Sequence, residues 1–201
     1  MTPAGWVPTF NAVRAGTGTV EHGAFMDEST VEEMLKRGTG FVPTLSSVIA
    51  IAYQHRLIGN NVMYQRILDD IVEAHNHSVN IAWRAGVPIA TGTDTSGEIV
   101  EELELIMHAT GASILDVLPS AGRTAAELAG VADKTGVIRP GLAADILIAD
   151  GDLLEEGFEV LRRPRWVLKS GKIHEGKPLH FGVRLIQERG LVTQFPAGSS
   201  L

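Results

Sequence analysis

The run Val87-Pro-Ile-Ala-Thr-Gly-Thr-Asp94 is the most informative part of this sequence, because an apolar, β-favouring stretch gives way to small residues and then a carboxylate. It follows Ala85-Gly86, a typical end for the long helical pattern before it. A carboxylate at the carboxyl end of a strand that follows a helix occupies the place where α/β barrels carry catalytic groups. The run therefore predicts a parallel βα architecture with a functional side chain at Asp94.

A second strand end has the same form. In Thr17-Gly-Thr-Val-Glu21-His22 a short extended run ends at an imidazole. One histidine and one aspartate on successive strand ends could form half of a metal site, although catalytic zinc uses three or more protein donors. His22 and Asp94 are therefore candidate metal ligands. The alternatives are a histidine satisfied by local hydrogen bonds and an aspartate that caps the next helix.

Helical and extended patterns alternate through the first part of the chain. Strands are expected at 16–20, 41–45 and 87–94, and helices at 27–37, 64–85, 99–108, 113–118 and 123–129, with a loop before Tyr64. Ser29 and Glu32 have the spacing of a capping box, and Gly38 is expected to end that helix. Three alternations of strand and helix indicate parallel βαβ units.

After Gly130 the pattern changes to short strands joined by turn residues, at 135–141, 144–150 and 165–174. Ser170-Gly171 is a candidate hairpin tip. This part is expected to form a small β module. The last ten or so residues have the composition of a frayed tail.

Composition narrows the class of protein. Of 201 residues, 44% are hydrophobic and 20% charged, and the net charge of -7 argues against a nucleic-acid or anionic-membrane surface. The sequence has no cysteine, which excludes disulfides, thiolate metal ligands and a cysteine nucleophile. No apolar run has transmembrane length and no signal-peptide pattern opens the chain, so a soluble, cytoplasmic protein is expected.

Seven stretches, in order, carry a resemblance to a known family. They are Val20-Glu-His-Gly23, Phe41-Val-Pro-Thr-Leu45, Gly86 to Asp94, Glu101-Glu-Leu-Glu-Leu105, Thr124-Ala-Ala-Glu-Leu-Ala-Gly130, Gly136 to Asp150, and Val167-Leu-Lys-Ser-Gly-Lys172. Over roughly residues 18–175 the chain resembles the amidohydrolase superfamily, specifically its imidazolonepropionase/prolidase-like branch.

The resemblance implies a (β/α)8 barrel that carries one or two divalent metals, commonly zinc. It also implies a small-molecule substrate, an amide, cyclic amide or dipeptide-like compound, whose C–N bond is hydrolysed by a metal-activated water. It implies that His22 is the metal-binding histidine at the end of strand six. It also implies that Asp94, at the end of strand eight, binds metal and takes the proton of that water, as the catalytic residue.

The family's ligands on strands one, four and five and the first strands of its β-sandwich have no counterpart in this sequence. A full barrel needs about 250 residues. The expected fold is therefore a partial TIM barrel of strands six to eight over residues 1–130, a partial β-sandwich over 131–190 and a tail over 191–201. The expected activity is that of an amidohydrolase fragment. The alternatives are a non-catalytic remnant, and a half-enzyme that assembles with a complementing chain carrying the other ligands. A homo-oligomer is a further possible assembly.

Three further motifs have simpler explanations. His75-Asn-His77 falls in a helical pattern, where side chains two apart point in different directions and cannot chelate together. Arg162-Arg-Pro-Arg165 is expected to be a solvated loop rather than an anion site. Thr44 could line a substrate pocket or serve packing at the end of strand seven.

Overall fold

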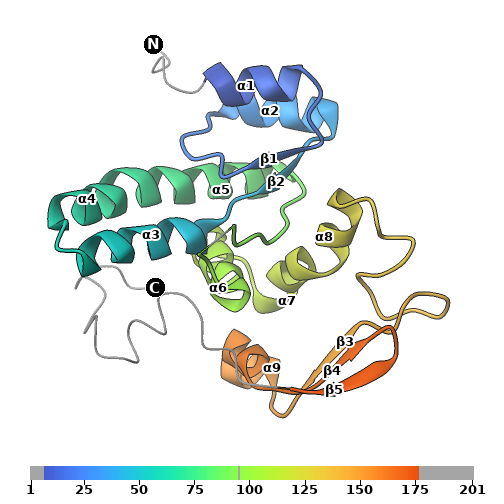
Figure 1. The fold of residues 1–201 in the computed structure, drawn as a ribbon. Coiled ribbons are helices and arrows are strands. Elements are labelled where there is room, and N and C mark those ends of the chain that lie inside the picture. The colour runs from blue at the N-terminus through green and yellow to red at the C-terminus, as the bar shows by residue number, and fades with distance from the viewer. Residues whose placement is uncertain (1–6, 95, 177–201) are drawn as a thin grey trace.

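The structure is a computed structural model that describes residues 7–94 and 96–176 (Figure 1). In chain order the elements are α1 (Val7–Arg14), β1 (Thr19–Glu21), α2 (Glu28–Arg37), β2 (Gly40–Val42), α3 (Leu45–Leu57), α4 (Asn61–Arg66), the π-helical segment η1 (Ile67–Val72), α5 (Glu73–Ala85), α6 (Ile99–Thr110), α7 (Ile114–Val117), the 3-10 segment η2 (Leu118–Ala121), α8 (Arg123–Leu128), β3 (Ile146–Ala149), α9 (Leu153–Glu156), the 3-10 segment η3 (Gly157–Arg162), β4 (Pro164–Lys169) and β5 (Lys172–Glu175).

The first three extended segments lie side by side and run parallel. β1 pairs with β2 in register from Thr19 opposite Gly40. The segment before Asp94 joins β2 only through a bridge between Phe41 and Ile89, in which the Phe41 N–H donates to the Pro88 carbonyl at 2.9 Å. The expected strand at 87–94 is thus reduced to one bridge, yet it keeps the predicted place beside β2.

Helix ends near these strands follow mostly from local sequence. Gly38 and Gly86 end α2 and α5 in the left-handed conformation, as predicted. The predicted capping box of α2 is wrong, because Asp27 is the N-cap and its Oδ1 accepts the Thr30 N–H at 2.9 Å. The Ser29 hydroxyl instead donates to the same Asp27 oxygen.

Helix α3 replaces the loop that was expected between β2 and Tyr64. Its apolar residues point in most directions, and Leu45, Ile49, Ala52 and Tyr53 are all buried. Such a helix lacks the single apolar stripe by which helical periodicity is recognised. α3 packs against α4 and α6, and α4, η1 and α5 follow one another in the region predicted as one long helix (Figure 1).

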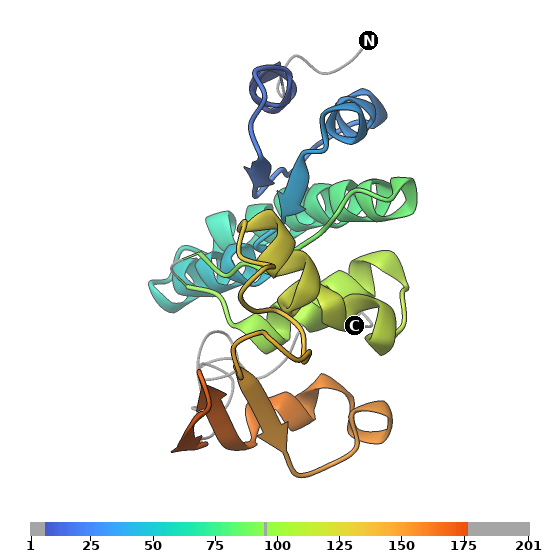
Figure 2. The same cartoon turned by 90° about the vertical axis from the view of Figure 1, so that its right-hand side faces the viewer.

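Between Gly130 and Gly176 the chain forms the small β module, in which β3, β4 and β5 make an antiparallel sheet (Figure 2). Ser170 and Gly171, at φ 50° and 79°, form the predicted hairpin tip. No strand forms at 135–141 within the described residues, and the expected tail at 191–201 lies outside them. Arg162 is buried in ion pairs, so the prediction of a solvated loop at 162–165 is wrong for this residue.

Candidate active site

The carboxyl ends of the three parallel segments share an unusual backbone geometry. His22, Thr44 and Asp94 follow successive segments and have φ values of 64°, 57° and 47°. Residues other than glycine seldom adopt this left-handed conformation, which costs of order 1 kcal/mol and gathers at functional sites. Three such residues on one edge of one parallel sheet indicate a site at that edge.

His22 is held at both its backbone and its ring. Its N–H donates to the Val42 carbonyl at 3.0 Å, which extends the pairing of β1 and β2 by one bond. Its Nδ1 atom lies 2.7 Å from Oγ1 of Thr44, a hydrogen bond between neighbouring strand ends. The His22 side chain is otherwise exposed, whereas Thr44 is buried. This bond leaves Nε2 as the ring nitrogen that could meet a ligand.

Asp94 is exposed in the loop that leads to α6. The cap of that helix is Glu98, whose carboxylate accepts the N–H groups of Val100 at 2.8 Å and Glu101 at 2.9 Å. The alternative that Asp94 caps the following helix is therefore wrong. Its role as a metal ligand remains a prediction.

A buried carboxylate lies behind these strand ends. Glu102 of α6 is 0% exposed, and its oxygens accept the N–H groups of Leu45 at 3.0 Å and Ser46 at 2.7 Å. Burial raises the pKa of Glu102 to about 7, although the backbone N–H groups of Ser46 and Leu45 oppose this shift. Nothing in the sequence around Glu102 marks it as a cap for a helix that starts 57 residues earlier.

His75 and His77 take opposite environments on α5. His75 is fully buried against the backbone of His22 and Pro43, and burial lowers its pKa to about 4. His77 is exposed. The two rings do not share a face, in line with the expectation that they do not chelate together.

The donors near the strand ends meet only part of what a divalent metal needs. Among residues 7–94 and 96–176, no group of three or more histidine or acidic side chains is placed to hold a metal ion. His22 and Asp94 are suitable donor types at the ends of the two segments that flank β2, but two donors are fewer than catalytic zinc requires. The described residues therefore fit part of such a centre and not the whole.

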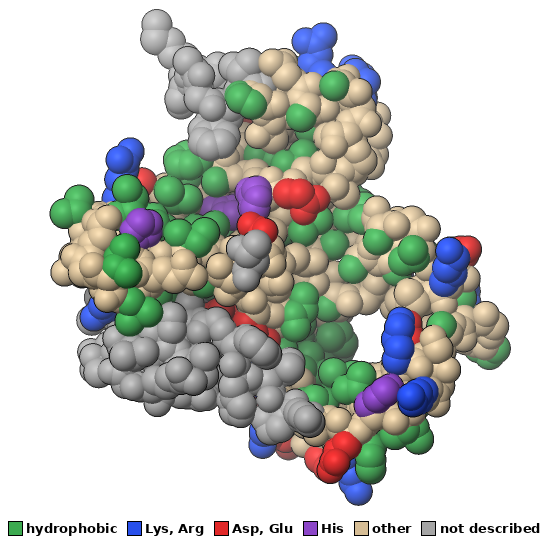
Figure 3. Space-filling view, viewed as in Figure 1, with side chains coloured by type: hydrophobic (Ala, Val, Ile, Leu, Met, Phe, Trp, Pro, Cys, Tyr) green, Lys and Arg blue, Asp and Glu red, His purple; other side chains and the backbone are tan. Residues whose placement is uncertain are grey.

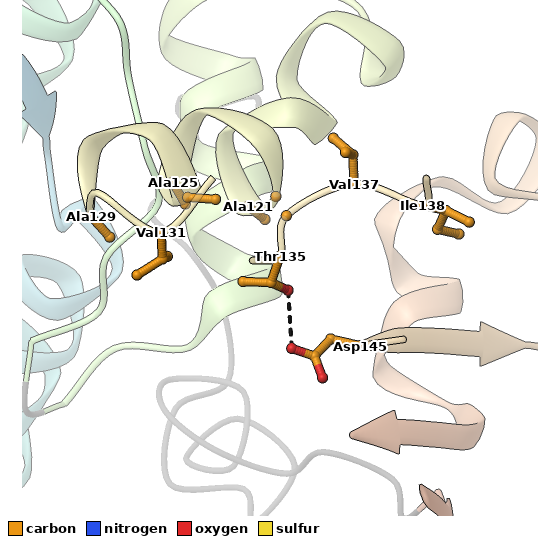
Figure 4. Close-up of a pocket in the computed structure, with 11 residues that line it drawn as sticks. Ala121, Ala125, Ala129, Val131, Thr135, Val137, Ile138 and Asp145 are labelled. Carbon is orange, nitrogen blue, oxygen red and sulfur yellow. Dashed lines mark hydrogen bonds between the residues drawn. The ribbon is translucent and has the colours of Figure 1, made fainter. Parts of the chain in front are cut away.

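A separate hollow lies between α8 and the β module (Figure 3). It has a volume of about 450 Å³, and its lining is mainly alanine and other apolar side chains, with a hydrogen bond of 3.0 Å from the Thr135 hydroxyl to Asp145 (Figure 4). Neither His22 nor Asp94 lines it. The hollow and the strand ends are thus different places on the molecule.

Comparison with known proteins gives a consistent result. The model of the amidohydrolase family matches residues 9–173. The chain is 31% identical over 171 residues to an ochratoxinase of Aspergillus niger, which covers 82% of this chain and 35% of the relative. A Xaa-Pro dipeptidase crystallised with bound methionine is 28% identical with a TM-score of 0.72, over 84% of this chain and 42% of that one.

A prolidase crystallised with N-methylphosphonate-L-proline is 29% identical with a TM-score of 0.73, over 84% of this chain and 43% of that one. The chain therefore spans less than half the length of each of these three proteins. Among the described residues, no helix is long and apolar enough to cross a bilayer.

Proposed function

Because this chain belongs to the amidohydrolase family, we propose that it forms part of a metal-dependent hydrolase that cleaves C–N bonds in small amide or dipeptide-like substrates. The proposal applies to an assembly that supplies the metal donors missing from the described residues. The activity of the isolated chain is expected to be low or absent for the same reason.

The proposed division of the chain follows from its two kinds of sheet. Residues 1–130 would carry strands six to eight of a TIM barrel, a view supported by the parallel order of β1, β2 and the Ile89 segment. Residues 131–190 would be part of a β-sandwich, supported by the antiparallel sheet β3–β5. The proposed tail at 191–201 lies beyond the described residues.

One observation supports the site above all others. His22 and Asp94 follow the two parallel segments that flank β2, and both share the left-handed conformation of Thr44, which follows β2. In barrels of this class, catalytic groups come from the carboxyl ends of several strands. We assign His22 and Asp94 as metal ligands, with Asp94 also the catalytic residue.

Asp94, His22 and Thr44 would have separate roles in the reaction. A divalent metal, zinc in our proposal, lowers the pKa of water at such a site to about 7. The Asp94 carboxylate would accept a proton from the attacking water and deliver it to the leaving nitrogen. His22 would bind through Nε2, because Thr44 already occupies Nδ1. In our proposal the hydroxyl of Thr44 keeps the ring from turning away.

The substrate class rests on the family and on three similar proteins. Two of them are named as a Xaa-Pro dipeptidase and a prolidase, and the third as an ochratoxinase. These names support small substrates with a hydrolysable C–N bond and leave the side chains of the substrate open. The net charge of -7 is consistent with a small-molecule substrate rather than nucleic acid.

The test is complementation. The chain is co-expressed with the part of the Aspergillus niger ochratoxinase that precedes the matched region, in medium with zinc or manganese. Release of amino acid from a panel of Xaa-Pro dipeptides and N-acyl amino acids is then measured. Turnover that appears only with both parts, and disappears in Asp94→Asn, is the expected result.

The same experiment separates the alternatives. Equal turnover by the isolated chain would show that it needs no complementing chain. If several relatives supply the missing part and the pair folds but no metal is retained, the non-catalytic remnant is the better description.

A further inference from the structure

Helix α3 begins at a point where its own sequence supplies no cap. Thr44 is the N-cap residue, but its side chain makes no capping hydrogen bond. Its hydroxyl lies 2.7 Å from His22 Nδ1 instead. Since the first turn of a helix leaves N–H groups without partners, a helix with a buried start needs an acceptor from elsewhere.

Glu102 supplies that acceptor from α6. Each carboxylate oxygen accepts one N–H of the first turn of α3, from Leu45 at 3.0 Å and from Ser46 at 2.7 Å. An anion at a helix N-terminus is favoured both by these N–H groups and by the helix dipole. Glu102 is 0% exposed, so water does not compete for these bonds. The start of α3 is therefore tied to α6 by a buried, charge-assisted contact.

Thr44, the residue before this contact, has a strained backbone and lies at the strand ends of the candidate site. Thr44 has φ 57° and ψ 37°, which a β-branched residue adopts only when its surroundings hold it. The backbone N–H of Thr44 also lowers the pKa of the Glu102 carboxyl group. The same helix start touches the Asp94 loop, since a side chain at Gly97 would meet Ser46 Oγ and Ser47 N.

We propose that Glu102 is a positioning residue, which holds the start of α3 and thereby Thr44, and through the Thr44 hydroxyl sets the tautomer and orientation of the His22 ring. The functional meaning rests on the proposed function, in which His22 binds through Nε2. Histidines that ligate metals generally donate their other ring N–H to a fixed acceptor. Glu102 would fix that acceptor without touching His22.

The experiment reads the His22 ring in the metal-free chain of 201 residues. Ring ¹⁵N shifts from long-range ¹H–¹⁵N spectra, in alkaline buffer, give the ratio of the two neutral tautomers. Wild type, Thr44→Val, Glu102→Gln and the double variant are compared. Thr44→Ser, which keeps the hydroxyl, is the conservative rescue. Glu104→Gln is the matched control, because it lies on the same helix and its bonds go to Arg162 rather than to α3.

We expect wild type, Thr44→Ser and Glu104→Gln to share one dominant His22 tautomer. Thr44→Val should shift the tautomer ratio roughly five- to tenfold, the scale of one hydrogen bond. Glu102→Gln should shift it in the same direction, and the double variant should match Thr44→Val alone. Glu102→Gln with wild-type His22 shifts would overturn the proposal, as would additive effects in the double variant.

Stability is measured alongside, because Glu102→Gln also weakens a helix cap. Added sucrose favours the compact state, and Glu102→Asp provides a milder change that keeps the charge. Failure of both variants to fold would overturn the proposal, since Glu102 would then hold the whole fold rather than one contact. The tautomer measurement needs neither metal nor substrate, so a negative complementation test does not change its outcome. Likewise, an unchanged tautomer in Glu102→Gln would leave the proposed function standing.

Discussion

The guanidinium of Arg162 lies 2.9 Å from the carboxylate of Glu98, and both side chains are buried although they are 64 residues apart in sequence. The same guanidinium bonds Glu104 at 2.7 Å and Glu159 at 3.0 Å. Hydrogen bonds and charges from Glu104 and Glu98 raise the pKa of Arg162, although burial opposes this. Because Glu98 also caps α6, one side chain ties the β module to the helix that follows the Asp94 loop.

Replacing Arg162 is therefore expected to be costly. Arg162→Ala leaves the buried Glu98 without its counter-charge and should lower the free energy of unfolding by about 3–5 kcal/mol. Urea unfolding checks this. Arg163→Ala is the control, since its pair with Glu156 is 54% and 42% exposed and should contribute at most about 1 kcal/mol. Equal losses in the two variants would contradict the buried network.

Glu101 should make stability fall as pH rises. Burial, with the charge of Glu98, raises its pKa from 4.5 to about 7, and its Oε2 has no hydrogen-bond partner among the described residues. A raised folded pKa gives stability that is present below pH 4.5 and is lost as pH rises through about 7. Glu101→Gln should thus match wild type in acid and exceed it above pH 7, by up to about 3 kcal/mol.

Urea unfolding across this pH range measures the effect, and Glu33→Gln is a control of opposite sign. The hydrogen bond from Arg37 lowers the pKa of Glu33 below 4.5, so Glu33 contributes stability above that value and loses it as pH falls. A Glu101→Gln variant that is less stable than wild type at alkaline pH would show that the carboxylate has a partner after all.

Gly97 should tolerate no side chain. A Cβ there would meet Ser46 Oγ, and would lie 2.8 Å from the Thr93 carbonyl oxygen and 2.9 Å from Ser47 N. Backbone cannot move aside cheaply, so Gly97→Ala should cost about 1–3 kcal/mol. Gly18→Ala, where a Cβ meets nothing within 4 Å, should be close to neutral in the same thermal unfolding measurement. A neutral Gly97→Ala would mean that the Asp94 loop does not pack on α3.

The isolated chain should hold zinc weakly, because His22 and Asp94 are its only assigned donors. After extensive dialysis we expect well under one zinc per chain by elemental analysis. His22→Ala and Asp94→Ala should lower the remainder further. One zinc per monomer, lost in both variants, would instead show that the chain completes a centre by itself and would refute the remnant alternative.

In the complemented enzyme, Asp94 should be the most sensitive position. Asp94→Asn keeps the shape but removes the base, and turnover should fall about 10²-fold or more. His22→Asn should mainly weaken metal affinity and recover in part with excess zinc or manganese. His77→Ala, on the exposed face of α5, should leave turnover nearly unchanged. Loss of turnover in His77→Ala but not in Asp94→Asn would overturn the assignment of both strand ends.

Local sequence determined much of the framework. Gly38 and Gly86 end helices because glycine enters the left-handed region without a Cβ penalty, and Ser170-Gly171 makes the hairpin for the same reason. The spacing of apolar residues predicted α2, α5 and α6, and the order of strands and helices predicted parallel pairing. It also singled out His22 and Asp94, because a polar residue after a β-favouring run is a short-range pattern.

Tertiary structure decided what holds those residues. α3 starts at Leu45 because Glu102 reaches it from α6, and Arg162 is buried because three carboxylates surround it. Each of these contacts except that to Glu159 joins residues more than 50 positions apart, and each carboxylate would be an ordinary surface residue if its partner were elsewhere. The strength of a charge-assisted hydrogen bond depends on the distance between its two groups and on the exclusion of water around them. Folding sets both, so the sequence alone does not reveal these contacts.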